Sequence, residues 1–315
     1  MAKFSRRDFL KLLSCGLGSA AILHFMRRTG VAAAVKNPNA RKKRPVATDH
    51  DLVKVKGTDP AAMTRKAVET LGGMGRFVKT GDVVVIKPNI GWDRSPETGA
   101  NTNPFVVAAL VEMCYEAGAK RVNVFDNTCN ASERCYVTSG IRKAAESKGA
   151  KVYFTDSWNY VKAQFPYDSP MEGWPVFRDA IECDAFINVP VLKHHGLTGL
   201  TLGMKNLMGI CGGSRGLMHL DIGRKLVDIT DFIKPDLTVI DGFRYLTRNG
   251  PTGGNLADVQ ALNTVIASAD FTLADVYSCR LVGKDPNSIP YIAHAIERGF
   301  GSEYYAKKDI VELSV

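Results

Sequence analysis

The segment Asp82-Val83-Val84-Val85-Ile86, followed directly by Lys87-Pro88-Asn89, decides the fold. Its four consecutive apolar residues are typical of a parallel strand that is buried on both faces, and the proline ends the strand. Similar runs predict strands at 121–125, 151–155, 184–189, 236–240 and 264–267. Helical patterns lie between or after them at 104–117, 139–148, 198–210, 219–233, 270–282 and 289–298. This alternation predicts an α/β fold, with a mostly parallel sheet and helices on both faces.

Polar side chains follow most of the predicted strands, at the point where each strand ends. In chain order they are Lys87, Asn89, Asp93, Asp126, Asn127, Lys193, His194, His195 and Asp241. Asn and Asp are ordinary turn formers, so one such residue indicates little. In an open parallel sheet, however, the ligand crevice lies outside the carboxyl ends of the strands. The shared position therefore predicts a ligand site on one rim of the sheet.

The densest group of polar residues lies in the segment 190–209, PVLKHHGLTGLTLGMKNLMG. We expect a turn at Lys193 and His195 and a helix that begins near Thr198, whose free N–H groups would attract an anion. On that helix Thr198, Thr201 and Lys205 would share one face, which is either part of the site or solvated. The following loop, 212–215 (GGSR), either closes on an anion or forms a plain turn.

The polar residues on this rim of the sheet could serve acid–base catalysis or could bind a metal ion. His194 and His195 are adjacent, so in an extended chain only one of them faces the site. We expect His195 to act as acid, base or ligand, with His219 as the second candidate, and Asp126 or Asp241 to act as general base. The set His195, Asp126 and Asp241 also suits a divalent metal. No H-x-x-x-H or H-E-x-x-H spacing supports a metal directly.

The first 34 residues have the pattern of a twin-arginine export signal. Ser5-Arg6-Arg7-Asp8-Phe9-Leu10-Lys11 precedes an apolar run, and Ala32-Ala33-Ala34 offers a cleavage site. The apolar run from Leu12 to Phe25 is short for a membrane span. We therefore predict a signal peptide at 1–34, a polar tether at 35–48 and a single α/β domain at 49–315. The expected location is the periplasm or another extracytoplasmic space, with the twin-arginine translocase as a partner during export.

Charge and cysteine usage exclude two function classes. The chain carries +9, but residues 1–46 hold 11 of its 41 Lys and Arg residues and only one of its 32 acidic residues. The other 269 residues are close to neutral, so the composition does not indicate nucleic-acid binding. Six cysteines follow the leader, without a C-x-x-C pair or ferredoxin-type run, so no iron–sulphur cluster is expected. Cys129 and Cys135 flank a probable loop and could pair in an oxidising compartment.

Three motifs resemble one known family. They are VVIKPN at 84–89, NVPVLKHHGLTGLTLGMKNLMG at 188–209 and LTVIDG at 237–242, and the likeness continues through Asn249-Gly250-Pro251 to Asp275. In this order they resemble the family catalogued as domain of unknown function 362, over roughly 80–303. The resemblance implies an α/β domain without a defined activity. Members often carry a ferredoxin-like domain, which this chain lacks.

The resemblance also singles out recurrent polar positions without assigning their roles. They are Lys87, Asn89, Lys193, His195, Thr201, Lys205, Asn206, Asp241, Asn249 and Asp275. Together with Thr198, we take Lys87, Asn89, Lys193, Thr201, Lys205, Asn206 and Asn249 as ligand-binding residues.

Two functions remain open from the sequence. The first is an exported enzyme or cofactor protein that binds a small anionic ligand, with or without a divalent metal. The second is a non-catalytic periplasmic accessory or maturation protein for a redox system, which would have a redox partner protein. The rim of Lys, His and Asp separates them, since a pure docking protein does not need it.

Overall fold

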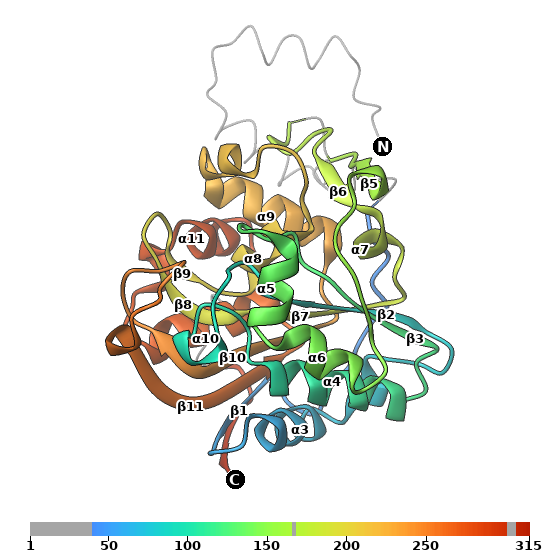
Figure 1. Ribbon diagram of the computed structural model, residues 1–315, viewed down its shortest axis with the longest axis vertical. Helices are drawn as coiled ribbons and strands as arrows, with labels where there is room; N and C mark the ends of the chain where they lie inside the picture. Colours follow the sequence, from blue (N-terminus) through green and yellow to red (C-terminus); the bar gives the residue numbers. More distant parts are fainter. Residues whose placement is uncertain (1–39, 166–167, 301–306) are drawn as a thin grey trace, which may run out of the picture. The chain divides into compact units, whose positions relative to one another are not determined.

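The computed structural model describes residues 40–165, 168–300 and 307–315, and these described residues pack as one compact unit (Figure 1). The predicted signal peptide and the first part of the predicted tether lie outside the described residues. One large sheet has the strand order β12-β1-β11-β10-β7-β2-β3-β4, and β8 and β9 extend it beside β10. Its strands are β1 (Leu52–Lys56), β2 (Val83–Pro88), β3 (Arg121–Val124), β4 (Lys151–Val152), β7 (Ala185–Val189), β8 (Val191–His195), β9 (Gly199–Thr201), β10 (Leu237–Leu246), β11 (Val259–Ser268) and β12 (Ile310–Ser314). A small separate sheet pairs β5 (Tyr160–Lys162) with β6 (Pro175–Phe177).

The middle of the sheet is parallel, which confirms the predicted fold class. β2 pairs in parallel with β3 on one side and with β7 on the other, and β7 pairs in parallel with β10. Antiparallel pairing occurs where β11 joins β10 and β1, and between β8 and β9. β2 and β7, at the centre of the sheet, have runs of consecutive apolar residues, as expected for parallel strands that are buried on both faces.

Helices cover both faces of the sheet and create two hydrophobic cores (Figure 1). Successive residues of each central strand point to opposite cores: Val85 joins the first core, while Val84 and Ile86 join the second. The first core is covered by α7 (Arg178–Glu182), α8 (Gly203–Asn206), α9 (Ile222–Ile233), α10 (Phe271–Leu281) and α11 (Pro290–Glu297). The second is covered by α3 (Pro60–Thr70), α4 (Pro104–Glu116), α5 (Ser132–Thr138) and α6 (Ile141–Glu146).

The helix predicted at 198–210 is wrong, and this changes the expected site. The chain continues past Pro190 as β8, turns at 196–198, and returns as the antiparallel strand β9, whose first residue, Gly199, has a φ of 74°. Only Gly203–Asn206 forms α8, followed by a 3-10 turn at Leu207–Ile210. The Gly and Thr spacing that suggested a helix therefore belongs to a short hairpin. Thr198, Thr201 and Lys205 do not share one helix face.

Residues 40–48, the later part of the predicted tether, contact the domain. Arg41 is buried, forms an ion pair with Asp236, and donates to the carbonyl oxygens of Ile233, Lys234 and Asp184. Lys43 donates to the carbonyl oxygen of Pro235 at 2.7 Å. The basic run at 41–44 is thus a structural part of the compact unit.

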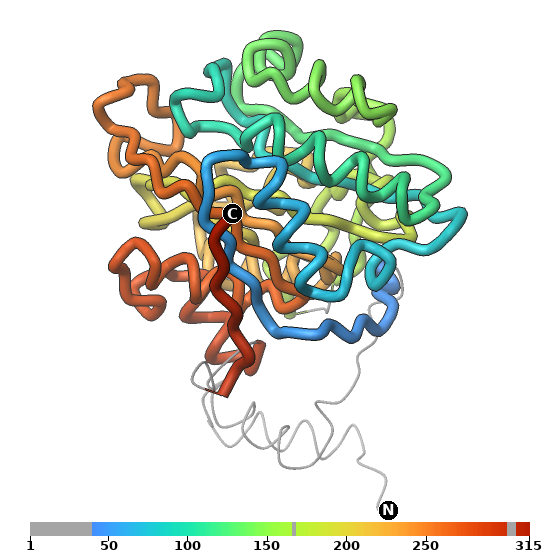
Figure 2. The backbone as a smooth tube through the Cα atoms, turned by 90° about the horizontal axis from the view of Figure 1, so that it is seen from below, coloured from blue at the N-terminus to red at the C-terminus, as the bar shows by residue number. Residues whose placement is uncertain are grey.

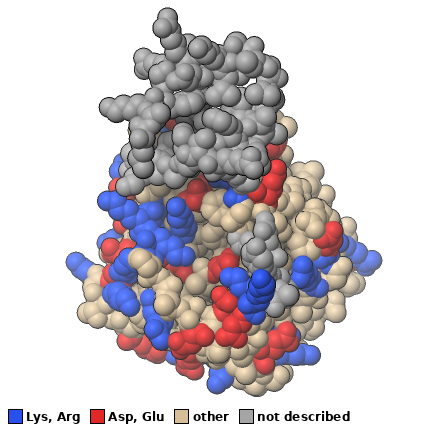
Figure 3. Space-filling view, turned by 180° about the vertical axis from the view of Figure 1, so that it is seen from behind, with Lys and Arg blue, Asp and Glu red and all other residues tan. Residues whose placement is uncertain are grey.

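At one edge of the sheet, a strand near the start of the described chain pairs with the strand at its end. β1 lies parallel to β12, with Leu52 opposite Ile310 and Lys56 opposite Ser314 (Figure 2). On the face shown in Figure 3, Lys and Arg are interspersed with Asp and Glu. A search of the described residues finds no helix both long and apolar enough to cross a membrane.

Candidate functional site

The floor of the site is a buried ion pair at the carboxyl ends of two neighbouring strands. Lys87 lies near the end of β2 and Asp126 follows β3, so the parallel pairing of these strands places them side by side. Lys87 Nζ lies 2.8 Å from Asp126 Oδ1, and both side chains are almost completely buried. Asp126 Oδ2 also accepts a hydrogen bond from the Ile90 amide. Burial lowers the pKa of Lys87, while the charge of Asp126 opposes that shift.

Position 209 needs a glycine because its backbone lies against the Lys87–Asp126 ion pair. A Cβ atom at position 209 would lie 1.7 Å from Asp126 Oδ1 and 2.5 Å from Lys87 Nζ. The backbone at 209 therefore packs directly against the two charged groups. A side chain at this position would have to displace them.

We expect Gly209→Ala to destabilise the protein and to disturb the site. Overpacking of a buried position costs about 1–3 kcal/mol, and here the displaced atoms belong to a charged pair. Chemical denaturation measures the change. Gly216→Ala is the matched control for stability, because a Cβ there has no neighbour within 4 Å. Equal stability of the two variants would contradict the close contact.

An amide network fixes the lysine of this pair. Asn206 on α8 accepts from Lys87 Nζ at 2.9 Å and donates to the Lys87 carbonyl oxygen and to Asn188 Oδ1. Asn89 donates to the same Asn206 oxygen at 3.3 Å. These bonds tie the short helix α8 to the ends of β2 and β7 and give the Lys87 ammonium a second oxygen partner beside Asp126.

Lys193 on β8 is a second buried lysine, and it has oxygen acceptors but no carboxylate partner among the described residues. Its ammonium donates to the Ala100 carbonyl oxygen and, at 3.3 Å, to Asn89 Oδ1. It also lies 5.9 Å from the centre of the Trp92 ring. Burial lowers the pKa of Lys193 to about 7.

Lys205 on α8 is the third lysine, and it has the weakest partner. Its side chain is only 8% exposed, and its Nζ lies 2.8 Å from the Met208 sulfur, a poor acceptor. Burial lowers the pKa of Lys205 to about 8. The buried hydroxyl of Thr201 also has no hydrogen-bond partner among the described residues.

These side chains face one cavity of about 470 Å³. Its lining includes Lys87, Asn89, Trp92, Asp126, Asn127, Cys129, Lys193, Thr201, Lys205, Asn206, Met208, Arg215, His219 and Pro251. Four of these described residues carry a basic side chain and Asp126 alone carries an acidic one. The cavity thus concentrates positive charge, although the chain beyond residue 46 is nearly neutral.

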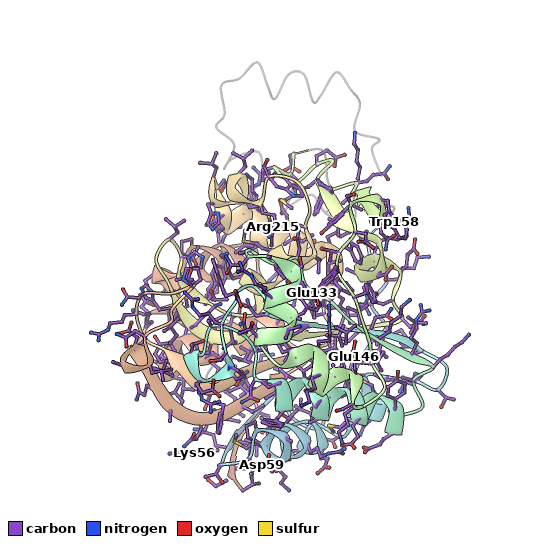
Figure 4. All side chains as sticks on the ribbon, viewed as in Figure 1. Lys56, Asp59, Glu133, Glu146, Trp158 and Arg215 are labelled. Atoms are coloured by element: carbon purple, nitrogen blue, oxygen red, sulfur yellow. The ribbon has the colours of Figure 1, made fainter. Side chains whose placement is uncertain are left out.

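The loop at 212–215 brings Arg215 to the cavity. Its guanidinium donates to the carbonyl oxygens of Asn127 and Thr128, each at 2.6 Å, which connects the loop to the end of β3. In Figure 4 Arg215 lies near α9 and α5, whereas Asp59 and Lys56 lie near α3 at the other end of the view. Arg215 therefore adds a fourth cation to a cavity that already has three.

The predicted anion site at a helix N-terminus near Thr198 is wrong. The helix begins at Gly203, and its first free amides, those of Gly203 and Met204, donate to the two carboxylate oxygens of Asp275. Burial raises the pKa of Asp275 to about 7, against the effect of these two amides. Thr198 is buried outside the cavity lining, and its hydroxyl donates to the Leu200 carbonyl oxygen.

His195 lies behind the cavity lining. Its Nδ1 accepts from the Leu197 amide, and its ring stacks on that of His219 with 5.8 Å between centres. Burial, with the nearby Lys205 charge, lowers the pKa of His195 to about 3, so the ring is neutral. His219, our second candidate, is the histidine that lines the cavity.

Asp241 and Asn249 are also outside the cavity lining. Asp241 is buried, and its carboxylate accepts from the amides of Asn103 and Phe243. Burial raises the pKa of Asp241 to about 6. Asn249 donates to Asp258 in the loop after β10. Asp241 thus holds two backbone segments and Asn249 holds the Asp258 side chain, and neither residue lines the cavity.

The side chains expected as metal ligands are held apart by separate partners. Asp126 pairs with Lys87, Asp241 binds two amides and His195 binds the Leu197 amide. The part of the chain that the structure describes holds no group of three His, Cys, Asp or Glu side chains with metal-site geometry. Cys129 and Cys135 are both free thiols, and Cys114 and Cys279 are buried as expected.

Sequence reasoning did not include Trp92, Cys129 and Met208 in the site. Each lies close in sequence to a predicted site residue, but only the folded chain shows that it faces the cavity. The role of Asp275 as the cap of α8 also had no local signal, because it lies about 70 residues from the amides it binds.

The chain is similar to several known proteins. The family model described as domain of unknown function (DUF362) matches residues 84–280. The thylakoid-associated protein sll1697 of Synechocystis sp. is 31% identical over 251 residues, which cover 74% of this chain and 73% of that protein.

Two solved structures also match. The lactate racemase apoprotein from Thermoanaerobacterium thermosaccharolyticum has a TM-score of 0.47 and 12% identity, over 77% of this chain. A structural-genomics protein from Thermotoga maritima has a TM-score of 0.44 and 16% identity, over 71% of this chain. The matches span 58% and 60% of the lengths of those two chains.

Proposed function

This chain belongs to the DUF362 family, and we propose that it binds a small anionic ligand in the cavity at the carboxyl ends of its parallel strands. One observation carries the proposal: the ammonium of Lys205 is buried in the cavity wall, and among the described residues its hydrogen-bond partner is a thioether sulfur alone. A buried charge without a partner is costly, so proteins rarely keep one without a use for it.

The other cations of the cavity support an anion as the ligand. Lys193 has neutral acceptors, and Arg215 is bonded to backbone carbonyls, so neither is neutralised by a carboxylate of the described residues. A hydrogen bond to a charged group contributes about 1.5–3 kcal/mol. The cavity volume is within the range of small-molecule sites. The lysines should therefore supply most of the affinity.

Thermal-shift measurements test this proposal. The purified chain is heated with sulfate, phosphate, oxalate, acetate or the chlorides of magnesium, manganese and zinc. We expect the divalent anions to raise the melting temperature more than acetate does, because several cations line the cavity. If no anion changes the melting temperature relative to an equal ionic strength of sodium chloride, the proposal fails.

We also propose that the chain works outside the cytoplasm. The support is the twin-arginine pattern at 5–11, and the relative sll1697 is described as thylakoid-associated. The small anion would then come from an extracytoplasmic compartment, after export through the twin-arginine translocase.

Replacing Arg6 and Arg7 together by Lys should hold a reporter fusion in the cytoplasm, because the translocase reads the arginine pair. Cell fractionation measures the distribution. The matched control replaces Arg27 and Arg28 by Lys, which makes the same exchange outside the motif and likewise leaves the charge unchanged. Normal export of the Arg6/Arg7 variant would overturn the localisation.

A further inference from the structure

We propose that Lys205 is an amine nucleophile that forms an imine with the carbonyl group of a small anionic ligand, of the 2-oxo acid or anionic aldehyde class. This inference rests on the proposed anion site, in which Lys193 and Arg215 would hold the anionic group. It adds a covalent step, carried out by Lys205, to the proposed binding of the anion in this cavity.

The partners of the three cavity lysines distinguish their roles. Lys87 is paired with a carboxylate, and Lys193 donates to two oxygen atoms. Lys205 contacts a thioether sulfur. Among the described residues Lys205 is therefore the one of the three whose nitrogen no oxygen acceptor holds in place, and it is the most available as a lone-pair donor.

Burial lowers the pKa of both lysines that lack a carboxylate partner, Lys193 to about 7 and Lys205 to about 8. Lys193 is held by two oxygen acceptors, so the contacts, and not the pKa values, single out Lys205. Near pH 7.5 the neutral fraction of Lys205 is about two-hundredfold larger than that of an ordinary exposed lysine. A lysine desolvated in a pocket that also contains other cations is a known way to activate this nucleophile.

The step balances without a further reagent. The ammonium first loses one proton, and the nitrogen lone pair then attacks the carbonyl carbon. The π electrons move to the carbonyl oxygen, which takes up one of the two hydrogens left on the nitrogen as a proton and gives a carbinolamine. The oxygen then leaves as water with the last hydrogen of the nitrogen, and a neutral C=N bond joins Lys205 to the ligand.

His219 is suited to accept the first proton. It lines the same cavity, and its Nδ1 lies 3.1 Å from the Gly216 carbonyl oxygen, which can only accept. The Nδ1 atom therefore carries the hydrogen of the neutral ring, and Nε2 has a free lone pair. Burial lowers the pKa of His219, which favours this neutral form.

Reductive trapping tests the inference. The full chain is incubated with glyoxylate, which combines an aldehyde with a carboxylate, and sodium cyanoborohydride at pH 7.5. Peptide mass spectrometry then locates the carboxymethyl groups. We expect Lys205 to be modified at least about tenfold faster than any other lysine, with the rate reduced by excess sulfate. Glycolaldehyde, which lacks the carboxylate, should label it more slowly.

Variants complete the test. Lys205→Met and Lys205→Arg should lose this label, and Lys66→Arg, at an exposed position, should keep it. A label spread over exposed lysines with Lys205 unmodified would overturn the inference. If sulfate still raises the melting temperature in that case, only the imine fails, whereas loss of both results would remove the anion site as well.

Discussion

Lys205→Met is expected to make the ligand-free protein more stable and its anion binding weaker. The folded state lowers the pKa of this lysine from 10.5 to about 8, and each tenfold change in protonation corresponds to about 1.4 kcal/mol. Removing the charge should therefore add up to about 3 kcal/mol to the free energy of unfolding near pH 6–7. Sulfate affinity should fall by roughly ten- to a hundredfold.

The stability that Lys205→Met adds should decrease as the pH rises. Below about pH 8 both the folded and the unfolded chain carry the proton on Lys205, so the full cost of the buried charge is present. As the pH rises from about 8 to 10.5, the folded state releases the proton first and the cost disappears. The stability advantage of Lys205→Met should therefore shrink over this range.

Lys225→Met is the matched control for the lysine variant. Lys225 is also 8% exposed, but its ammonium donates to the Leu217 carbonyl oxygen at 2.8 Å. Its replacement should lower stability or leave it unchanged. Equal effects of the two substitutions in urea denaturation would mean that the missing partner of Lys205 has no energetic consequence.

Arg41→Met is expected to destabilise the chain by about 3–5 kcal/mol, because it leaves a buried carboxylate without its partner. Arg41 pairs with Asp236, and its guanidinium also donates to carbonyl oxygens at the end of α9 and before β7. The Asp236 carboxylate in turn accepts from the Phe186 amide on β7. The loss of one side chain thus affects a point where three segments meet.

Arg44→Met provides the comparison for the arginine variant. Arg44 pairs with Asp82, but its side chain is 38% exposed, and pairs of this kind contribute about 0–1 kcal/mol. Chemical denaturation should separate the two variants by at least about 2 kcal/mol. A loss of less than about 1 kcal/mol for Arg41→Met would show that the run at 41–44 is a tether after all.

The central strands were predictable from the sequence, and the edge strands were not. β2 and β7 have three or four consecutive apolar residues, whereas β3 and the first half of β10 place one buried Asn or Thr among their apolar residues. β1 (LVKVK) and β12 (IVELS) alternate apolar and polar residues over five positions, and each needs the other or β11 as a partner. Such a short pattern indicates a strand only when its neighbour is known.

The site was predicted in part. Lys87, Asn89, Asp126 and Lys193 meet in one cavity because parallel strands bring their carboxyl ends to one edge. Asp241 also follows an apolar run, but β10 continues past it to Leu246, and the amides of Asn103 and Phe243 bind its carboxylate. Sequence position alone does not show whether a carboxylate faces a ligand or a free N–H group.

Thr201, Lys205 and Asn206 were expected in the site for a wrong reason. We placed them on the face of a long helix, whereas a β-hairpin and one turn of helix bring them to the cavity. The contacts of the basic run at 41–44 could not be predicted from the sequence. Arg41 pairs with Asp236, which lies 195 residues further along the chain, and no local pattern indicates this contact.

The most direct test of the anion site is the pH dependence of sulfate affinity, measured by isothermal titration calorimetry on the wild-type chain. Sulfate keeps its charge across the range, so a change in affinity reports on the protein. Lys193 and Lys205, with pKa values of about 7 and 8, must be protonated to bind it. We predict a dissociation constant that is lowest near pH 6 and rises at least about tenfold by pH 9.5. An affinity that is constant from pH 6 to 9.5 would contradict the account.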